Sequence, residues 1–219
     1  MFRGLIRPMV SAFAALALTI GAAALPGKAW AQTKVTIAVG GAGCLCYLPT
    51  VLAQQLGEYE RAGVNVNLID FKGGSQSLTA VLGGSADVVS GYFDHCVNLA
   101  AKNQPMQSFV VYDRYPGFAL VVSPKHADKV KSVKDLANLK VGGSAPGSST
   151  DFFLKFILKK NGVDPNNVGV VGIGLAATAV AAMEQGSVEA AIMLDPAITQ
   201  LQGRNKDLKI LVDTRTQKD

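Results

Sequence analysis

The stretch from Lys140 to Phe153, KVGGSAPGSSTDFF, most narrowly limits the folds open to this chain. The apolar residue Val141 is expected to end a short strand, small and hydroxyl residues follow, and a helical pattern begins at Phe152. The first turn of a helix has backbone N–H groups without internal partners and a partial positive charge, so it can bind a polar or anionic small molecule. Ser148 and Asp151 also fit a capping box, in which they would only close the helix.

The same order of strand, small polar turn and helix recurs along the chain. Further strands are expected at residues 35–39, 64–71, 86–90, 108–112, 118–122, 168–171, 190–194 and 208–212, and helices at 47–56, 75–82, 95–99, 132–139, 152–160 and 176–185, with a short one after Asp195-Pro196. Such alternation predicts an α/β fold with parallel-rich sheets covered by helices. Ligands of these sheets bind outside the carboxyl ends of the strands.

Polar turns lie at those expected ends. They are Gly40–Cys46, Gly73–Gln76, Gly91–His95, Ser144–Thr150, Gly172–Gly174 and Asp195. Because they fall into two alternating segments, we expect two lobes with a ligand cleft between them. The expected divisions are lobe 1 at 32–116, lobe 2 at 117–213 and the start of a second crossing at 214–219.

The first 31 residues are predicted to be a secretory signal peptide and not part of the fold. Arg3 and Arg7 make a basic start, Met9 to Leu25 is apolar, and Ala29-Trp30-Ala31 fits an Ala-x-Ala cleavage site. The apolar run is shorter than the roughly 20 residues of a spanning helix. Export to the periplasm, with cleavage after Ala31, is therefore expected.

Charge and composition argue against a nucleic-acid surface. Without its first 31 residues the chain of 219 retains 188, and its formal net charge falls from +5 to +2 because Arg3, Arg7 and Lys28 are lost. No basic run with interleaved aromatic residues remains. A chain of this length can form one sizeable core or two small ones.

Three cysteines allow two interpretations. In an oxidising compartment, Cys44, Cys46 and Cys96 can give one disulfide and one free thiol. A Cys/His metal site that also uses His95 is the alternative, although Cys44 and Cys46 are too close in sequence for the usual zinc spacing. His126, the other histidine, is expected at the surface.

Two aspartates have competing roles. Asp94 and Asp195 each precede a helical pattern and are well placed as caps. If they point inward instead, they would repel an anion and suit an amine-bearing or heteroaromatic solute. Tyr92 and Phe93 could stack on a ligand or pack beneath their turn.

Four runs of sequence carry a family resemblance: GGSQSLTAVLGGSADVVSGYFDH, RYPGFALVVS, KSVKDLANLKVGGSAPGSSTDFFLK and AAIMLDPAITQL. Their order and spacing, from about Val35 to the C-terminus, resemble the nitrate, sulfonate, taurine and thiamine-precursor (SsuA/THI5-like) solute-binding proteins of ABC importers. The resemblance implies a type II periplasmic-binding-protein fold whose lobes close on a small solute. The expected ligand-binding residues are Cys44, Tyr47, Gly74, Ser75, Tyr92, Phe93, Asp94, His95, Ser144, Gly147, Ser148, Ser149, Thr150 and Asp195.

Members of that family continue for roughly another hundred residues to complete the first lobe. The present sequence stops soon after Asp213. We therefore expect a C-terminally truncated chain whose first lobe lacks part of its helical cover and exposes apolar surface.

The leading hypothesis is a monomeric binding protein, not an enzyme, that needs no cofactor or metal and passes a small solute to an ABC permease. Helix N-termini and serines suit a sulfonate, nitrate or carboxylate. The alternative is an enzyme of the pyrimidine-synthesis branch of the same superfamily, using Cys44, Cys46 and His95. A sensor domain with the same cleft is a third possibility.

Overall fold

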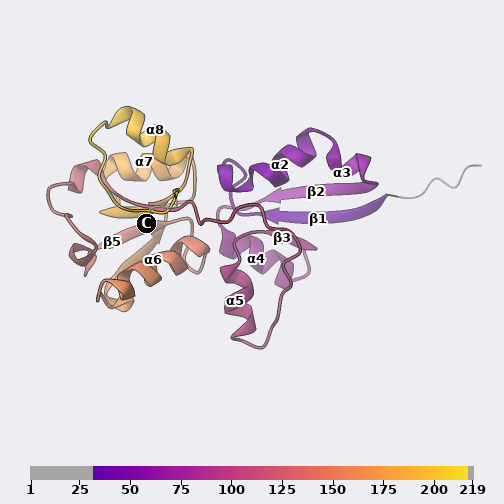
Figure 1. Ribbon diagram of the computed structural model, residues 1–219, viewed down its shortest axis with the longest axis horizontal. Coiled ribbons are helices and arrows are strands. Elements are labelled where there is room, and N and C mark those ends of the chain that lie inside the picture. The colour runs from indigo at the N-terminus through magenta and orange to yellow at the C-terminus, as the bar shows by residue number, and fades with distance from the viewer. Residues whose placement is uncertain (1–31, 217–219) are drawn as a thin grey trace, which may run out of the picture. The chain divides into compact units, whose positions relative to one another are not determined.

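The structure, a computed structural model, describes residues 32–216 and contains two sheets with their helices (Figure 1). The expected signal peptide, residues 1–31, and the last part of the expected second crossing, residues 217–219, lie outside the described residues. Within 32–216, no helix is both long and apolar enough to cross a membrane.

The first sheet has three parallel strands in the order β2-β1-β3. They are β1 (Thr33–Val39), β2 (Val64–Asp70) and β3 (Val88–Ser90), and the helices among and after them are η1 (Leu45–Tyr47), α2 (Leu48–Gln55), α3 (Glu58–Arg61), α4 (Gly74–Leu82) and α5 (Asp94–Ala100). Helix α4 packs on β1 and β3, and α3 packs on β2. All three strands fall within residues 32–116.

The second sheet has five strands in the order β6-β5-β7-β4-β8. The strands are β4 (Ala119–Val122), β5 (Lys140–Gly143), β6 (Gly169–Gly172), β7 (Ala190–Met193) and β8 (Ile210–Asp213); the helices are η2 (Pro124–His126), η3 (Val133–Leu136), α6 (Ser149–Lys160), η4 (Pro165–Asn167), α7 (Ala177–Gln185) and α8 (Ala197–Arg204). Strand β4 is antiparallel to both of its neighbours, whereas β5 is parallel to β6 and β7. The expected parallel-rich α/β fold is thus confirmed.

The period-two alternation of β4 divides the core of the second sheet into two layers. Leu120 and Val122 point into one cluster, which also contains Leu154 and Leu158 of α6. Ala119 and Val121 point into the other, which contains residues of α7 and α8. Every residue of β4 and β7 is buried, because both faces of these strands are covered.

The expected strand over residues 108–112 is wrong. No backbone–backbone hydrogen bond of the described residues involves 105–113, and β3 pairs only with β1. A β-branched and aromatic run becomes a strand only when a neighbouring strand supplies its ladder. The helix expected over residues 132–139 is also shorter than expected, since only Val133–Leu136 form a helix, the 3-10 helix η3, which begins with a capping box from Ser132 and Asp135.

Apolar surface is exposed around the first sheet, as expected. The buried cluster there is small and consists of Ala38, Ala80 and Ala86. By contrast, Phe109 and Val111 have 75% and 76% of their surface exposed. The exposed apolar residues of this part of the chain lie mainly on α2 and on residues 109–115.

Candidate ligand-binding site

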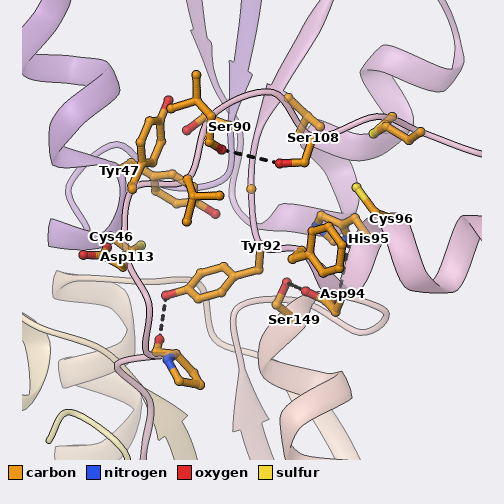
Figure 2. Close-up of a pocket in the computed structure, with 18 of the residues that line it drawn as sticks. Cys46, Tyr47, Ser90, Tyr92, Asp94, His95, Cys96, Ser108, Asp113 and Ser149 are labelled. Carbon is orange, nitrogen blue, oxygen red and sulfur yellow. Dashed lines mark hydrogen bonds and ion pairs between the residues drawn. The ribbon is translucent and has the colours of Figure 1, made fainter. Parts of the chain in front are cut away.

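A cavity of about 600 Å³ lies where β3, α5 and residues 106–116 meet the N-terminal part of α6 (Figure 2). This volume falls in the range of sites that bind small molecules. Apolar and aromatic side chains form most of the wall. Asp94 and His95 of α5 and Ser149 of α6 supply a polar cluster.

Asp94 does not cap α5, which corrects the favoured expectation for this residue. Phe93 holds the N-cap position, and Asp94 is the first helical residue. Asp94 Oδ1 accepts a hydrogen bond from Ser149 Oγ at 2.5 Å, and Asp94 Oδ2 lies 3.7 Å from His95 Nδ1. Asp94 Oδ2 and His95 Nε2 are buried and have no hydrogen-bond partner. The carboxylate therefore retains an unused acceptor.

Burial controls the protonation of this cluster. It raises the pKa of Asp94, although the hydrogen bond from Ser149 and the proximity of His95 act in the opposite direction. Burial also lowers the pKa of His95, against the effect of Asp94. His95 therefore favours its neutral form and does not neutralise the carboxylate.

Two glycines make room for the His95 ring. A Cβ at Gly74 would lie 3.2 Å from His95 Nε2, and a Cβ at Gly91 would lie 3.1 Å from His95 Cδ2. Both distances are shorter than ordinary side-chain contacts. Gly74, expected to bind ligand, thus borders the polar cluster through its contact with His95 and does not itself line the cavity.

Three aromatic rings in contact form one wall. The Tyr92 ring stacks on Phe118 with centroids 4.7 Å apart, and Phe118 packs against Phe153 at 4.9 Å. The Tyr92 hydroxyl donates to the Pro116 carbonyl at 3.0 Å (Figure 2). Burial raises the pKa of both Tyr47 and Tyr92, so their phenols stay neutral.

The hydroxyls before and within the first turn of α6 bond mainly to each other. Ser148 Oγ lies 2.8 Å from both Ser144 Oγ and Thr150 Oγ1, and it donates to the Ala145 carbonyl at 2.6 Å. Thr150 Oγ1 also accepts from the Ser144 N–H at 2.9 Å. Three of the expected ligand-binding hydroxyls are therefore already satisfied inside the turn.

The capping box expected from Ser148 and Asp151 is wrong in its partners. Ser148 holds the N-cap position of α6 but makes no side-chain cap bond. Asp151 Oδ2 accepts instead from the Gly147 N–H at 2.7 Å and from Lys155 Nζ at 2.9 Å. The Ser148 hydroxyl points toward the Ala145 carbonyl instead, so it does not bond to a backbone N–H in the first turn of α6.

The turn before α4 and the turn before α6 face each other. A Cβ at Gly73 would lie 2.9 Å from Ala145 Cβ, and a Cβ at Gly147 would lie 3.8 Å from Ser75 Cβ. The two turns contact each other directly at this point. Ser75 lines a smaller hollow, which it shares with Phe71, Gln76 and Thr79.

Cys44 and Cys46 form a disulfide, and Cys96 is free. Cys44 is buried in the core beside Tyr47, whereas Cys46 and Cys96 line the cavity. Two of the four residues of the alternative metal site are thus joined to each other. Among the described residues, no group of three histidine, cysteine or acidic side chains is placed to hold a metal ion.

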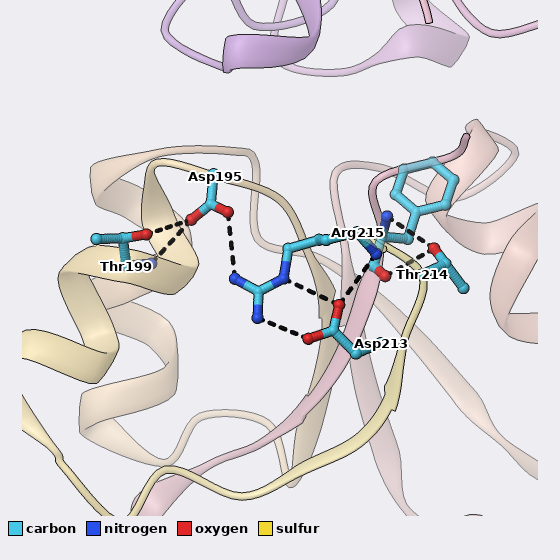
Figure 3. Close-up of polar contacts among 6 residues, drawn as sticks. Asp195, Thr199, Asp213, Thr214 and Arg215 are labelled. Atoms are coloured by element: carbon cyan, nitrogen blue, oxygen red, sulfur yellow. Dashed lines mark hydrogen bonds and ion pairs between the residues drawn. The ribbon is translucent and has the colours of Figure 1, made fainter. Parts of the chain in front are cut away.

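Asp195 acts as a helix cap and an ion-pair partner (Figure 3). Its Oδ1 accepts from Thr199 N at 3.0 Å and Thr199 Oγ1 at 2.7 Å, in the first turn of α8. Its Oδ2 accepts from Arg215 Nη1 at 3.2 Å. Partial burial would raise the pKa of Asp195, but these bonds outweigh it and lower the pKa. Both carboxylate oxygens are occupied.

The structure brings together fewer than half of the expected ligand-binding residues. Those that line the cavity are Tyr47, Tyr92, Phe93, Asp94, His95 and Ser149. Those outside it are Cys44, Gly74, Ser75, Ser144, Gly147, Ser148, Thr150 and Asp195. Their use in ligand binding stays a prediction. Sequence reasoning missed the wall formed by residues 106–116, because it placed part of them in a strand.

A family model described as NMT1/THI5 like matches residues 47–216, which is more than half of the chain. The chain belongs to the NMT1/THI5-like family. No protein in a search of curated sequences matches it.

Solved structures agree with this NMT1/THI5-like assignment. A protein from Bordetella bronchiseptica RB50 is 41% identical, with a TM-score of 0.81 over 85% of this chain and 58% of its own. The alkanesulfonate-binding protein SsuA from Xanthomonas axonopodis pv. citri, bound to MOPS, is 21% identical, with a TM-score of 0.65 over 85% of this chain and 62% of its own. The periplasmic nitrate-binding protein NrtA from Synechocystis PCC 6803 is 13% identical, with a TM-score of 0.64 over 83% of this chain and 51% of its own.

These likenesses show the type II periplasmic-binding-protein fold for the described residues of this NMT1/THI5-like chain. The chain spans between about half and three fifths of the length of these three structures.

Replacing Asp94 by asparagine is expected to stabilise this NMT1/THI5-like protein without ligand at pH 7. Asparagine keeps an oxygen for Ser149 but removes a buried charge with an unpartnered oxygen, so the free energy of unfolding should rise by about 1 kcal/mol. Because burial raises the pKa of Asp94, the folded state retains this proton to a higher pH than the unfolded state. Wild-type stability therefore falls as pH rises through the raised pKa, and the advantage of Asp94→Asn should vanish in acid.

Thermal unfolding followed by circular dichroism between pH 4 and pH 8 measures this difference. Burial lowers the pKa of His95 in both proteins, and loss of the Asp94 charge lowers it further in the variant, so the comparison at pH 7, where His95 is neutral in both, isolates the Asp94 charge. The neighbouring Tyr47 and Tyr92 stay neutral over the whole range. An asparagine variant that is less stable than wild type at pH 7 would contradict the prediction, since the charge would then stabilise the fold.

Proposed function

We propose that the chain is the solute-binding component of an ABC importer and that the cavity beside Asp94 and Ser149 holds its solute. The observation that carries the proposal is the cavity of about 600 Å³, whose wall combines aromatic rings with a hydrogen-bonded polar cluster. Membership of the NMT1/THI5-like family and the fold shared with solute-binding proteins support it.

Binding would join two parts of the chain. Asp94 and Tyr92 follow the first sheet, whereas Ser149 and Phe153 belong to α6 of the second. A solute that contacts both groups binds best when they are close, so it stabilises the closed arrangement. Each neutral hydrogen bond contributes only about 1 kcal/mol net, and affinity must come from several made together in a desolvated site.

The proposed setting is the periplasm. The basic start, apolar run and Ala-x-Ala site of residues 1–31 support export. A membrane permease would then be the partner that receives the solute from the closed protein.

A thermal-shift screen of alkylsulfonates, taurine, nitrate, aminopyrimidines and arylalkylamines tests the proposal. A solute present at a hundred times its dissociation constant should stabilise the protein by about 2.7 kcal/mol. For a domain of this size that corresponds to a rise of roughly 5–11 °C in Tm. Mass analysis should recover the solute unchanged, which separates binding from turnover.

The proposal fails if no compound of the screen raises Tm or gives heat in calorimetry. It also fails if the bound compound is recovered chemically altered, because that outcome would favour the pyrimidine-synthase-like enzyme.

A further inference from the structure

The Asp94 carboxylate is a buried charge with half of its hydrogen-bonding capacity unused. Its side chain is 9% exposed and that of His95 is 3% exposed. Ser149 Oγ occupies Oδ1 at 2.5 Å, and Oδ2 has no partner. An unpartnered buried carboxylate oxygen is costly, and a donor supplied by a ligand removes that cost.

The charges around the cavity favour a cation over an anion. Four lining side chains carry formal charges, namely Asp87, Asp94, Asp113 and Arg114, which sum to −2 with His95 neutral. Arg114 is exposed on the 106–116 segment, whereas Asp94 is the buried member of the set. An anion deep in the cavity would therefore meet a buried like charge.

The aromatic wall of the cavity favours a ligand that contains an aromatic ring. Tyr92 stacks on Phe118, and Phe118 in turn packs at a tilt against Phe153, so the three rings form one aromatic surface beside the polar cluster. Aromatic rings of a ligand pack well on such a wall, and ring faces also attract an adjacent cation. A solute with one ring and one ammonium group matches both features.

We propose that the cavity takes a small aromatic solute carrying a protonated primary amine, whose N–H groups donate to Asp94 Oδ2 while its ring packs against Tyr92. The Ser149 hydroxyl holds the carboxylate in position from the opposite oxygen. This inference rests on the proposed solute-binding function and adds the chemical class of the solute.

Three probes with the same ring and different head groups test the inference on the full chain. Benzylamine carries an ammonium group, benzyl alcohol is a neutral match, and phenylmethanesulfonate is an anion. In isothermal titration calorimetry at pH 7, benzylamine should bind at least about tenfold more tightly than benzyl alcohol, because a charge-assisted hydrogen bond is roughly twice as strong as a neutral one. Phenylmethanesulfonate should bind most weakly.

Substitutions distinguish the effect of the Asp94 charge on binding from the effect of packing around the ligand. Asp94→Asn should weaken benzylamine binding at least about tenfold and change benzyl alcohol binding by less than about twofold, because only the charge is removed. Asp128→Asn is the matched control, since this aspartate is fully exposed near Lys131 and lies outside the cavity. It should leave all three affinities unchanged. If Asp94→Asn does not fold, the order of the three probes on the wild-type protein decides the question.

The outcomes also separate this inference from the proposed function. Tighter binding of phenylmethanesulfonate than of benzylamine overturns the inference and leaves a solute-binding protein for anions. An equal loss of benzylamine and benzyl alcohol in Asp94→Asn also overturns it, because the residue would then act through structure. No binding by any compound of this set or of the wider screen overturns both.

Discussion

Replacing Gly40 by alanine is expected to lower the free energy of unfolding by roughly 3 kcal/mol. Gly40 follows β1, where the chain passes the N-terminus of α4. A Cβ at this position would lie 2.5 Å from Gly74 N and 2.7 Å from the Gly73 carbonyl carbon. Both obstacles are backbone atoms, so the clash cannot be relieved by a rotamer change. The Tm should fall by about 6–12 °C.

Gly203→Ala provides a control of opposite sign. Gly203 lies in α8, and a Cβ there would meet no atom within 4 Å. Alanine favours a helix over glycine by about 1 kcal/mol, so this variant should be neutral or more stable. Thermal and urea unfolding of the two variants measure the contrast. If the two variants changed the free energy of unfolding equally, the lack of space for a Cβ would not be the reason why residue 40 is a glycine.

Leu158→Ala should lower the free energy of unfolding by about 3 kcal/mol, within the range found when a fully buried leucine is truncated. Leu158 is fully buried on α6 and packs in the cluster that contains Leu120 and Ile192 of the second sheet. Its removal leaves a cavity between helix and sheet that close-packed neighbours fill only in part.

Phe156→Ala tests the same helix from its outer side. Phe156 has 57% of its surface exposed, so its truncation should cost well under half as much, despite the larger side chain. Urea unfolding gives both values. A larger loss for Phe156→Ala would mean that this face of α6 is covered in solution.

The α/β fold was predictable because the local hydrophobic patterns of its strands match the burial of those strands in the folded protein. Alternation at Val35 to Val39 and the buried run at Ala190 to Leu194 both became strands, and the glycine-containing turns after several strands lead into helices. Residues 108–112 do not form a strand, although their β propensity is high. A strand needs a partner ladder, and the pattern of one segment carries no information about its neighbour.

The site was less predictable, because hydroxyl and carboxyl groups have several possible partners. The pattern Ser148-x-x-Asp151 suggested a cap, yet Ser148 bonds to Ala145 and Asp151 to Gly147 and Lys155. Asp94 and Asp195 looked alike in sequence. Only folding shows that Arg215 and Thr199 satisfy Asp195, whereas Asp94 keeps a vacant acceptor.

The free backbone of residues 105–113 bears on how a molecule can enter the cavity. This wall has no ladder that must be broken before it moves. Side-chain bonds at two tyrosine hydroxyls fasten it to the rest of the protein: Tyr112 to Thr50 at 2.7 Å, and Tyr92 to Pro116 at 3.0 Å. A molecule could therefore enter the cavity if these two hydrogen bonds and the adjoining apolar contacts broke, while β1, β2 and β3 kept their pairing.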